Sequence, residues 1–213
     1  MIKFDGYLDK YGMVTCNGVP APVGENSENG LLFTAHGMYA QLGAYNKTEF
    51  DFEKLFTPCF IDGKLYRSPE PHPKPDSHDN YSAVAMASSL IGNTSMPRKL
   101  LWSLVKHFGV VNGEIFLRFP QVWILLLITS FPMLKWLFYP LARLLAEFNI
   151  PKPENDGGDI QLKLTIIATL DTMYKGQNFL EEFNFKLSKG LNQYYNDYYR
   201  NENFPTVRIW NGE

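Results

Sequence analysis

The chain contains 213 residues, of which 45% are hydrophobic and 20% are charged, and its formal net charge is -2. A chain of this length and composition can bury a core without metal ions or disulfides, which excludes disorder and collagen-like structure. The near-neutral charge also argues against a nucleic-acid partner, because phosphate binding needs clustered Lys and Arg side chains. We expect one mainly α-helical domain over residues 1–213.

The first 23 residues are expected to form a short β-rich or irregular arm before the helical body of residues 24–213. Brief apolar stretches in this arm are separated by glycine-containing turns such as Asn17-Gly18. The chain starts with charged and glycine residues instead of an apolar segment, so we expect no secretory signal. Cys16 and Cys59 have no CxxC spacing and are expected to be buried thiols, with a single disulfide as the alternative.

The middle of the chain is expected to hold four helices. Apolar residues at helical spacing predict a first helix over residues 30–44 and a short one over 49–56. After the proline-rich loop 68–75, a helix rich in Ala and Ser is expected to bury Tyr81 and to let its neighbours approach closely. It ends near Gly92, and a helix beginning near Pro97 follows. The expected apolar stripe of this fourth helix is Leu100, Leu101, Leu104, Val105 and Phe108.

The segment 119–134 carries no charge and is followed by a second apolar run, 136–139. It is shorter than the roughly 20 residues needed to cross a bilayer, so we expect burial between other helices, with membrane contact as the alternative. Two further helices are predicted, one over residues 160–174 and a last one over 178–200. The abundance of aromatic residues, 15% of the chain, is attributed mainly to core stripes that include Phe108, Phe131, Trp136 and Phe183.

The fold expected from these elements is a stack of helical hairpins, of which an α/α toroid is one arrangement. Two proline loops, 73–76 and 151–154, have similar sequences, and each is followed by an acidic residue at the start of an apolar helix. This similarity indicates either a degenerate repeat of hairpins or coincidence in a chain with 14 prolines.

Three predicted helices begin behind loops rich in acidic, histidine and asparagine residues. If their N-termini face the same way, they frame a polar funnel into which the helix dipoles point. The candidate catalytic residues there are Glu28, His36, His78, Asp79 and Tyr81, and the candidate ligand-binding residues are Arg67, Asp76 and Arg118.

Each of these candidates also has a structural interpretation. Asp79 can act as a helix cap, which contributes roughly 0.5–2 kcal/mol. His36 can be a hydrogen-bonded core histidine, because it lies on an otherwise apolar helix. Arg118 precedes a long apolar run and is expected to pair with Asp79 or Asp76.

Metal and cofactor sites are not expected. His72, Asp76, His78 and Asp79 lie close together, but their spacing matches no zinc or calcium pattern. The dinucleotide, P-loop and serine-hydrolase signatures GxGxxG, GxxxxGK[ST] and GxSxG are missing from the sequence.

Five short motifs occur in an order that resembles a group of tailed-bacteriophage proteins. They are Asn29-Gly30-Leu31-Leu32-Phe33-Thr34-Ala35, Leu65-Tyr66-Arg67-Ser68-Pro69, Ser77-His78-Asp79-Asn80-Tyr81, Arg118-Phe119-Pro120 and Phe204-Pro205. The resemblance implies a mostly helical phage protein made during infection, with Asp79 as the acidic residue of a Ser-x-Asp motif and Arg67 and Arg118 as basic partners. Asn80 stands where a second acidic residue is common, which weakens any two-carboxylate mechanism.

The functional expectation is therefore a virion-associated structural or accessory component. Its expected location is the virion or the infected host cytoplasm, and its expected partners are other virion proteins or further copies of itself. The alternative is a glycan-processing hydrolase or lyase whose cleft is formed by helix N-termini around Asp79.

Overall fold

The structure is a computed structural model that describes residues 4, 8–15, 30–69, 78–111, 114–149, 157–179 and 181. It is mainly helical, which confirms the expected fold class at that level. The predicted last helix over 178–200, and with it Phe183, lies almost entirely outside the described residues. The α-helices in the described part are α1 (Gly30–Tyr45), α2 (Phe52–Leu55), α3 (His78–Ile91), α4 (Ser95–Lys106), α5 (Pro120–Ser130), α6 (Tyr139–Phe148) and α7 (Gly157–Met173).

Two small antiparallel hairpins interrupt the helices. Strands β1 (Phe60–Ile61) and β2 (Lys64–Leu65) pair through the turn at Asp62 and Gly63, and β3 (Val110–Val111) pairs with β4 (Glu114–Ile115). Asp62 and Gly63 both have positive φ, 51° and 79°, as a two-residue type I′ turn requires. Three short 3-10 helices complete the described elements: η1 (Thr57–Cys59), η2 (Phe116–Arg118) and η3 (Pro132–Leu134).

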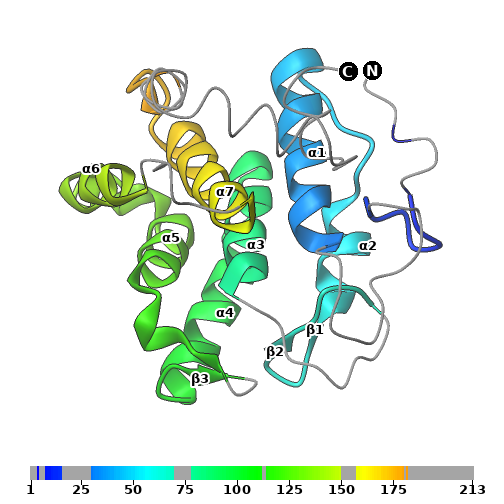
Figure 1. Ribbon diagram of the computed structural model, residues 1–213, viewed down its shortest axis with the longest axis horizontal. Coiled ribbons are helices and arrows are strands. Elements are labelled where there is room, and N and C mark those ends of the chain that lie inside the picture. The colour runs from blue at the N-terminus through cyan, green and yellow to red at the C-terminus, as the bar shows by residue number, and fades with distance from the viewer. Residues whose placement is uncertain are drawn as a thin grey trace.

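Helix α3 is the centre of the molecule. It contacts α1 on one side, α5 and α4 on another, and α7, which crosses in front of it in Figure 1. Its residues from Asn80 to Ser88 are all buried, and their small side chains let four helices pack around one axis. This confirms that neighbouring helices approach α3 closely, as expected from its Ala- and Ser-rich sequence. A helix that is buried on all sides also has no need of a polar face.

The N-terminal residues that the structure describes pack against α1. Residues 8–15 contain one isolated antiparallel bridge, Leu8 to Val14, and the Val14 N–H donates to Thr34 Oγ1 at 2.9 Å. Phe4 is buried against Phe50, with ring centroids 5.3 Å apart. The first helix of the body is therefore covered by aromatic side chains that come from both before and after it in sequence.

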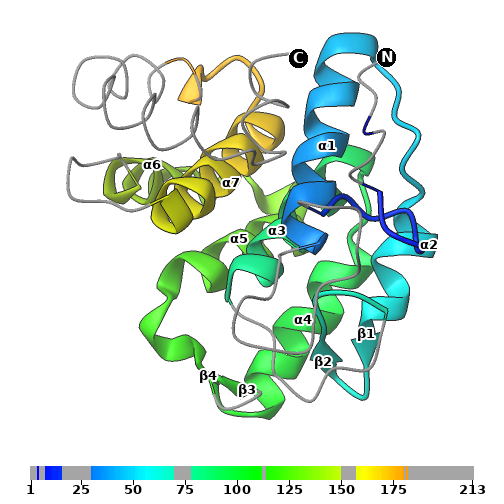
Figure 2. The ribbon, with the colours of Figure 1, turned by 45° about the vertical axis from the view of Figure 1, so that its right-hand side comes forward.

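Helices α1, α3 and α7 begin at the same side of the molecule. In Figures 1 and 2 their N-terminal ends are the lower ends of the three ribbons. Two observations agree with this direction. His36 on α1 is hydrogen-bonded to Thr165 on α7. One turn later on α1, burial and the negative charge of Asp171, further along α7, raise the pKa of Tyr39 to about 12. The common orientation required for the predicted funnel is therefore present in these three helices.

No helix in the described part of the chain combines the length and the apolar character needed to cross a bilayer. The expected burial of the apolar segment is right for α5, where Val122, Leu125, Leu126 and Ile128 are fully buried. It is wrong for the residues that follow, because Phe131 and Trp136 are 39% and 59% exposed. Phe108 and Val105, expected on the core stripe of α4, are also exposed.

Candidate functional site

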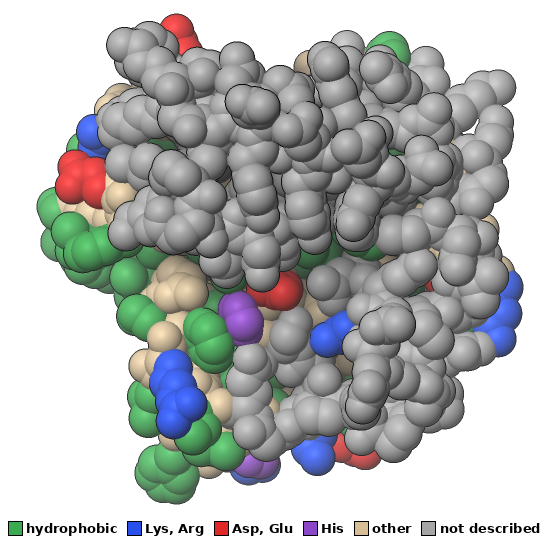
Figure 3. All heavy atoms as spheres, viewed as in Figure 1, with side chains coloured by type: hydrophobic (Ala, Val, Ile, Leu, Met, Phe, Trp, Pro, Cys, Tyr) green, Lys and Arg blue, Asp and Glu red, His purple; other side chains and the backbone are tan. Residues whose placement is uncertain are grey.

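His78 and Asp79 form the polar pair at the start of α3. His78 Nε2 lies 3.1 Å from Asp79 Oδ1, and about a fifth of each side chain is exposed, 20% and 24%. The His78 ring stacks on Phe119, with centroids 3.8 Å apart and planes at 10°. Near the middle of the face in Figure 3, a histidine and an acidic side chain lie next to each other beside hydrophobic side chains. The pair is therefore held in place and partly accessible to solvent.

The position of Asp79 within the helix differs from that of a cap. Helix α3 begins at His78, so Asp79 lies inside the first turn. A carboxylate there still interacts favourably with the positive end of the helix dipole, by about 0.3–1 kcal/mol. It also gives His78 a negatively charged neighbour, which is the arrangement that an acid–base pair uses.

His36 is a core residue. It is fully buried on α1 and is hydrogen-bonded through Nε2 to Thr165 Oγ1, at 2.8 Å. Burial lowers the pKa of His36 from its usual 6.5 to about 3, because the charged ring cannot be solvated there. The ring is therefore neutral and inaccessible to solvent, and its hydrogen bond links α1 to α7. The interpretation of His36 as a hydrogen-bonded core histidine is confirmed.

Tyr81 is also sealed. It is fully buried, and its ring packs on Phe116 with centroids 4.6 Å apart and planes at 55°. An aromatic side chain must present a face to solvent in order to stack on a sugar, so Tyr81 serves the core of α3 in this structure.

The two arginines expected near the site come from different segments, Arg67 from the chain after β2 and Arg118 from η2. Arg67 is half-buried, and its carbonyl oxygen lies directly beneath Gly30 at the start of α1, 3.1 Å from where a Cβ would be. Arg118, in η2, is exposed and makes no ion pair with any residue in the described ranges. Of the two partners expected for Arg118, Asp79 is therefore wrong, and Asp76 lies outside the described residues.

The remaining predicted site residues, Glu28 and Asp76, lie outside the described residues, as does His72. Within the ranges that the structure does describe, no group of three or more His, Cys, Asp or Glu side chains is arranged to hold a metal ion. Cys59 is buried, and its thiol donates to the Leu55 carbonyl at 3.2 Å.

Sequence reasoning missed an exposed apolar surface formed by the C-cap residue of α5, η3, the turn after it and α6. We call it the α6 face. Helix α6 uses one stripe, including Ala142 and Leu145, to contact the body, while the neighbouring stripe of Leu141, Leu144 and Phe148 faces solvent. The sequence did contain a signal for this stripe: from Leu137 to Phe148, apolar residues recur at helical spacings of four, three and four residues. The face comprises Phe131, Met133, Leu134, Trp136, Leu137, Leu141, Leu144 and Phe148.

At the level of class, the fold defines a mainly α-helical protein with one central buried helix. No protein-family model, curated protein or solved structure matches the chain.

Proposed function

We propose that this chain is a structural or accessory component of a tailed-bacteriophage particle and that it assembles with a second copy of itself through the α6 face. The order of the five sequence motifs supports the phage assignment. The observation that carries the assembly role is the α6 face, because a chain that acts alone gains nothing from leaving so much apolar surface in water.

The size of the α6 face supports an interface between two copies. Its eight side chains are between 39% and 92% exposed. At roughly 200 Å² for a fully exposed side chain of this kind, they present about 900 Å² of surface. The largest apolar patch of a typical monomer measures about 300–600 Å², whereas each partner contributes about 800 Å² to a standard interface.

The charges beside the α6 face favour a second copy over a charged partner. Lys135 donates to the Met173 carbonyl at 2.9 Å and lies over the Trp136 ring, 5.5 Å from its centroid. Arg143 lies over the Phe179 ring at 5.4 Å. Both cations are therefore engaged within the chain. The eight side chains of the face are themselves apolar, and an apolar surface of this kind can be complementary to itself in a twofold dimer, with Glu147 the exposed charge on α6 beside it.

We expect the double substitution Leu137→Lys and Leu144→Lys to weaken self-association about a hundredfold or more, because it buries two unpaired charges in the interface. Sedimentation velocity at tens of micromolar should show a dimer for the wild type and a monomer for the variant. Ile91→Lys is the matched control: Ile91 is 44% exposed, close to the 47% of Leu144, but lies on α3.

A wild-type protein that is monomeric at all concentrations would contradict the assembly role. The phage assignment is tested separately by mass spectrometry of purified particles, where absence of the chain from intact virions would exclude the structural version. The two experiments are independent, so either part of the proposal can fail alone.

A glycan-processing hydrolase or lyase is the second candidate, favoured by the partly solvent-accessible His78–Asp79 pair and by the common direction of α1, α3 and α7. In this case the chain is part of a toroid of stacked helical hairpins whose helix N-termini line the cleft. Asp79 would handle the proton, and Arg118 would neutralise a substrate carboxylate.

For the enzyme hypothesis, Asp79→Asn should reduce turnover of a polysaccharide or peptidoglycan substrate by about 100-fold or more, because amide nitrogen and oxygen cannot replace a carboxylate in proton transfer. The melting temperature is expected to fall by at most a few degrees, since the interaction of Asp79 with the helix dipole is worth about 0.3–1 kcal/mol. Loss of folding, with no turnover of any glycan by the wild type, would favour a purely structural role for Asp79.

A further inference from the structure

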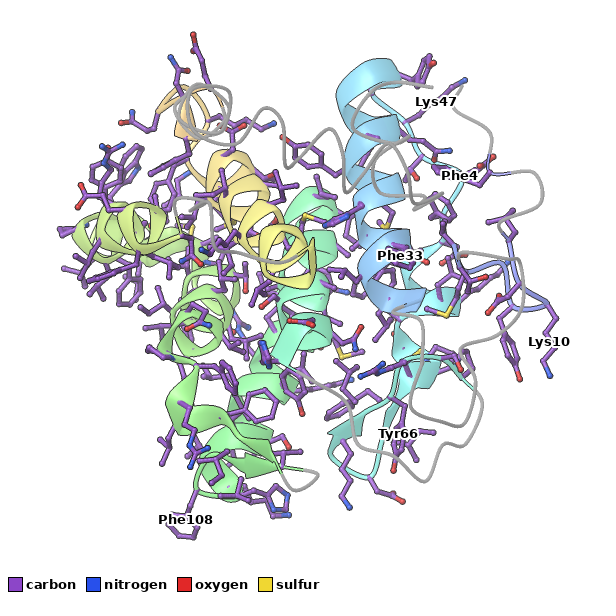
Figure 4. All side chains as sticks on the ribbon, viewed as in Figure 1. Phe4, Lys10, Phe33, Lys47, Tyr66 and Phe108 are labelled. Atoms are coloured by element: carbon purple, nitrogen blue, oxygen red, sulfur yellow. The ribbon has the colours of Figure 1, made fainter. Side chains whose placement is uncertain are left out.

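A second exposed apolar surface lies at the C-terminal end of α4 and the adjoining hairpin, and we call it the α4 tip. Phe108, Trp102 and Leu117 are 86%, 68% and 67% exposed. In Figure 4 the labelled Phe108 points away from the body at the lower end of the molecule. The tip comprises Trp102, Val105, Phe108, Val110, Ile115 and Leu117.

The backbone at Phe108 is one that favours glycine. Phe108 has φ of 52°, and Gly109 after it has φ of 71°. The Gly109 N–H donates to the Leu104 carbonyl at 2.7 Å. This is the 6→1 hydrogen bond of the Schellman motif, which ends many helices. In that motif the left-handed residue is usually glycine, because a Cβ is disfavoured there. Phe108 therefore occupies a strained position without burying its ring, so the fold gives no reason for an aromatic side chain here.

Two lysine side chains lie beside Trp102 at the same tip. A pocket of about 270 Å³ opens between α4 and the β1–β2 turn, and Lys99, Lys106 and His107 line it beside Trp102. Neither Lys99 nor Lys106 forms an ion pair within the described part of the chain, although Asp62 lines the same pocket. The pocket walls are completed by Phe60, Gly63 and Ser103.

The charge at the α4 tip distinguishes it from the α6 face. At the α6 face, Lys135 and Arg143 are engaged by a carbonyl and by aromatic rings. At the tip, Lys99 and Lys106 are exposed, and Arg118 is exposed one residue after Leu117. Large exposed apolar side chains with uncommitted cations beside them are complementary to the boundary of an anionic lipid bilayer, where anionic headgroups cover an apolar interior.

We infer that the α4 tip binds the surface of anionic membranes, with Phe108 and Leu117 entering the headgroup–acyl boundary and Lys99 and Lys106 holding a lipid phosphate in the pocket. The chain then lies on the membrane and does not cross it, in line with the lack of a spanning helix among the described residues. This inference goes beyond the proposed assembly role and uses none of the α6 face.

Flotation of the full chain with vesicles tests the inference. Vesicles of phosphatidylcholine with about 30% phosphatidylglycerol should bind the chain about tenfold more tightly than phosphatidylcholine alone, and added salt should reduce the difference. The double substitution Lys99→Gln and Lys106→Gln should remove the preference for phosphatidylglycerol. Lys47→Gln is the matched control, because Lys47 is exposed on the opposite side of the molecule.

Phe108→Gly separates a binding role from a structural one. The substitution should raise the melting temperature by about 2–4 °C, since glycine adopts the left-handed backbone freely. It should also weaken vesicle binding about tenfold. Vesicle binding that is equal in wild type and Phe108→Gly, or a wild type that binds no anionic vesicle, would overturn the inference. Capture of a protein by the tip without vesicle binding would overturn it as well.

Discussion

Replacing Gly37 by alanine is expected to destabilise the protein by about 1–3 kcal/mol, because the new methyl group overpacks the core. A Cβ at Gly37 would lie 2.9 Å from Phe50 Cε2 and 3.2 Å from Phe4 Cζ. Both rings are buried and lie against each other, so neither can rotate away without disturbing the cover of α1. The steric cost exceeds the gain of about 1 kcal/mol that alanine normally brings to a helix interior.

Gly43→Ala is the matched control in the same helix. No atom lies within 4 Å of the position of its Cβ, so this variant should be stabilised by about 0.5–1 kcal/mol. Urea unfolding of the two variants and the wild type measures the free energy of unfolding of each, and so shows whether each substitution stabilises or destabilises the protein. Equal shifts for the two substitutions would mean that Phe4 and Phe50 do not hold α1 as the structure describes.

The sequence predicted the helices near the core well because their boundaries are marked chemically. The first helix was expected over residues 30–44 and runs from Gly30 to Tyr45. The small side chains of α3 indicated close packing, and that helix is buried on every side. In both cases the local sequence pattern and the tertiary environment favour the same structure. The local pattern alone is therefore sufficient to predict the helix.

The two hairpins were missed although the sequence contains a signal for each. Asp62-Gly63 separates β1 from β2, and Asn112-Gly113 separates β3 from β4 in the sequence. Both dipeptides are typical of two-residue hairpin turns. The strands are only two residues long, so periodicity gives no strand pattern to accompany the turn. The β1–β2 turn forms one wall of the pocket at α4.

Exposure was the property that the sequence predicted least well. Apolar spacing shows which residues share a stripe, but it cannot show whether another element covers that stripe. Leu144 and Leu145 are adjacent in sequence, yet one is exposed and the other is buried. The same limit applies to the site. Arg118 was expected to pair with Asp79 or Asp76 on the basis of charge, whereas the neighbour that stacks on His78 of the His78–Asp79 pair is the Phe119 ring.

Lowering the pH is expected to destabilise the protein through His36. The folded chain holds this residue with a pKa of about 3, whereas the unfolded chain has the usual pKa of 6.5. Between these two values the unfolded state binds a proton that the folded state does not bind. The free energy of unfolding should therefore be fully retained above pH 6.5 and should fall by about 1.4 kcal/mol for each pH unit below it.

His36→Gln isolates this effect from the titration of the carboxylates. Glutamine can still hydrogen-bond to Thr165 but does not titrate, so the slope of unfolding free energy between pH 4 and 6 should decrease by about 1.4 kcal/mol per unit. Urea unfolding of the wild type and of the variant across this pH range measures the two slopes. An unchanged slope in His36→Gln would mean that His36 is protonated in the folded state, which is incompatible with a sealed contact between α1 and α7.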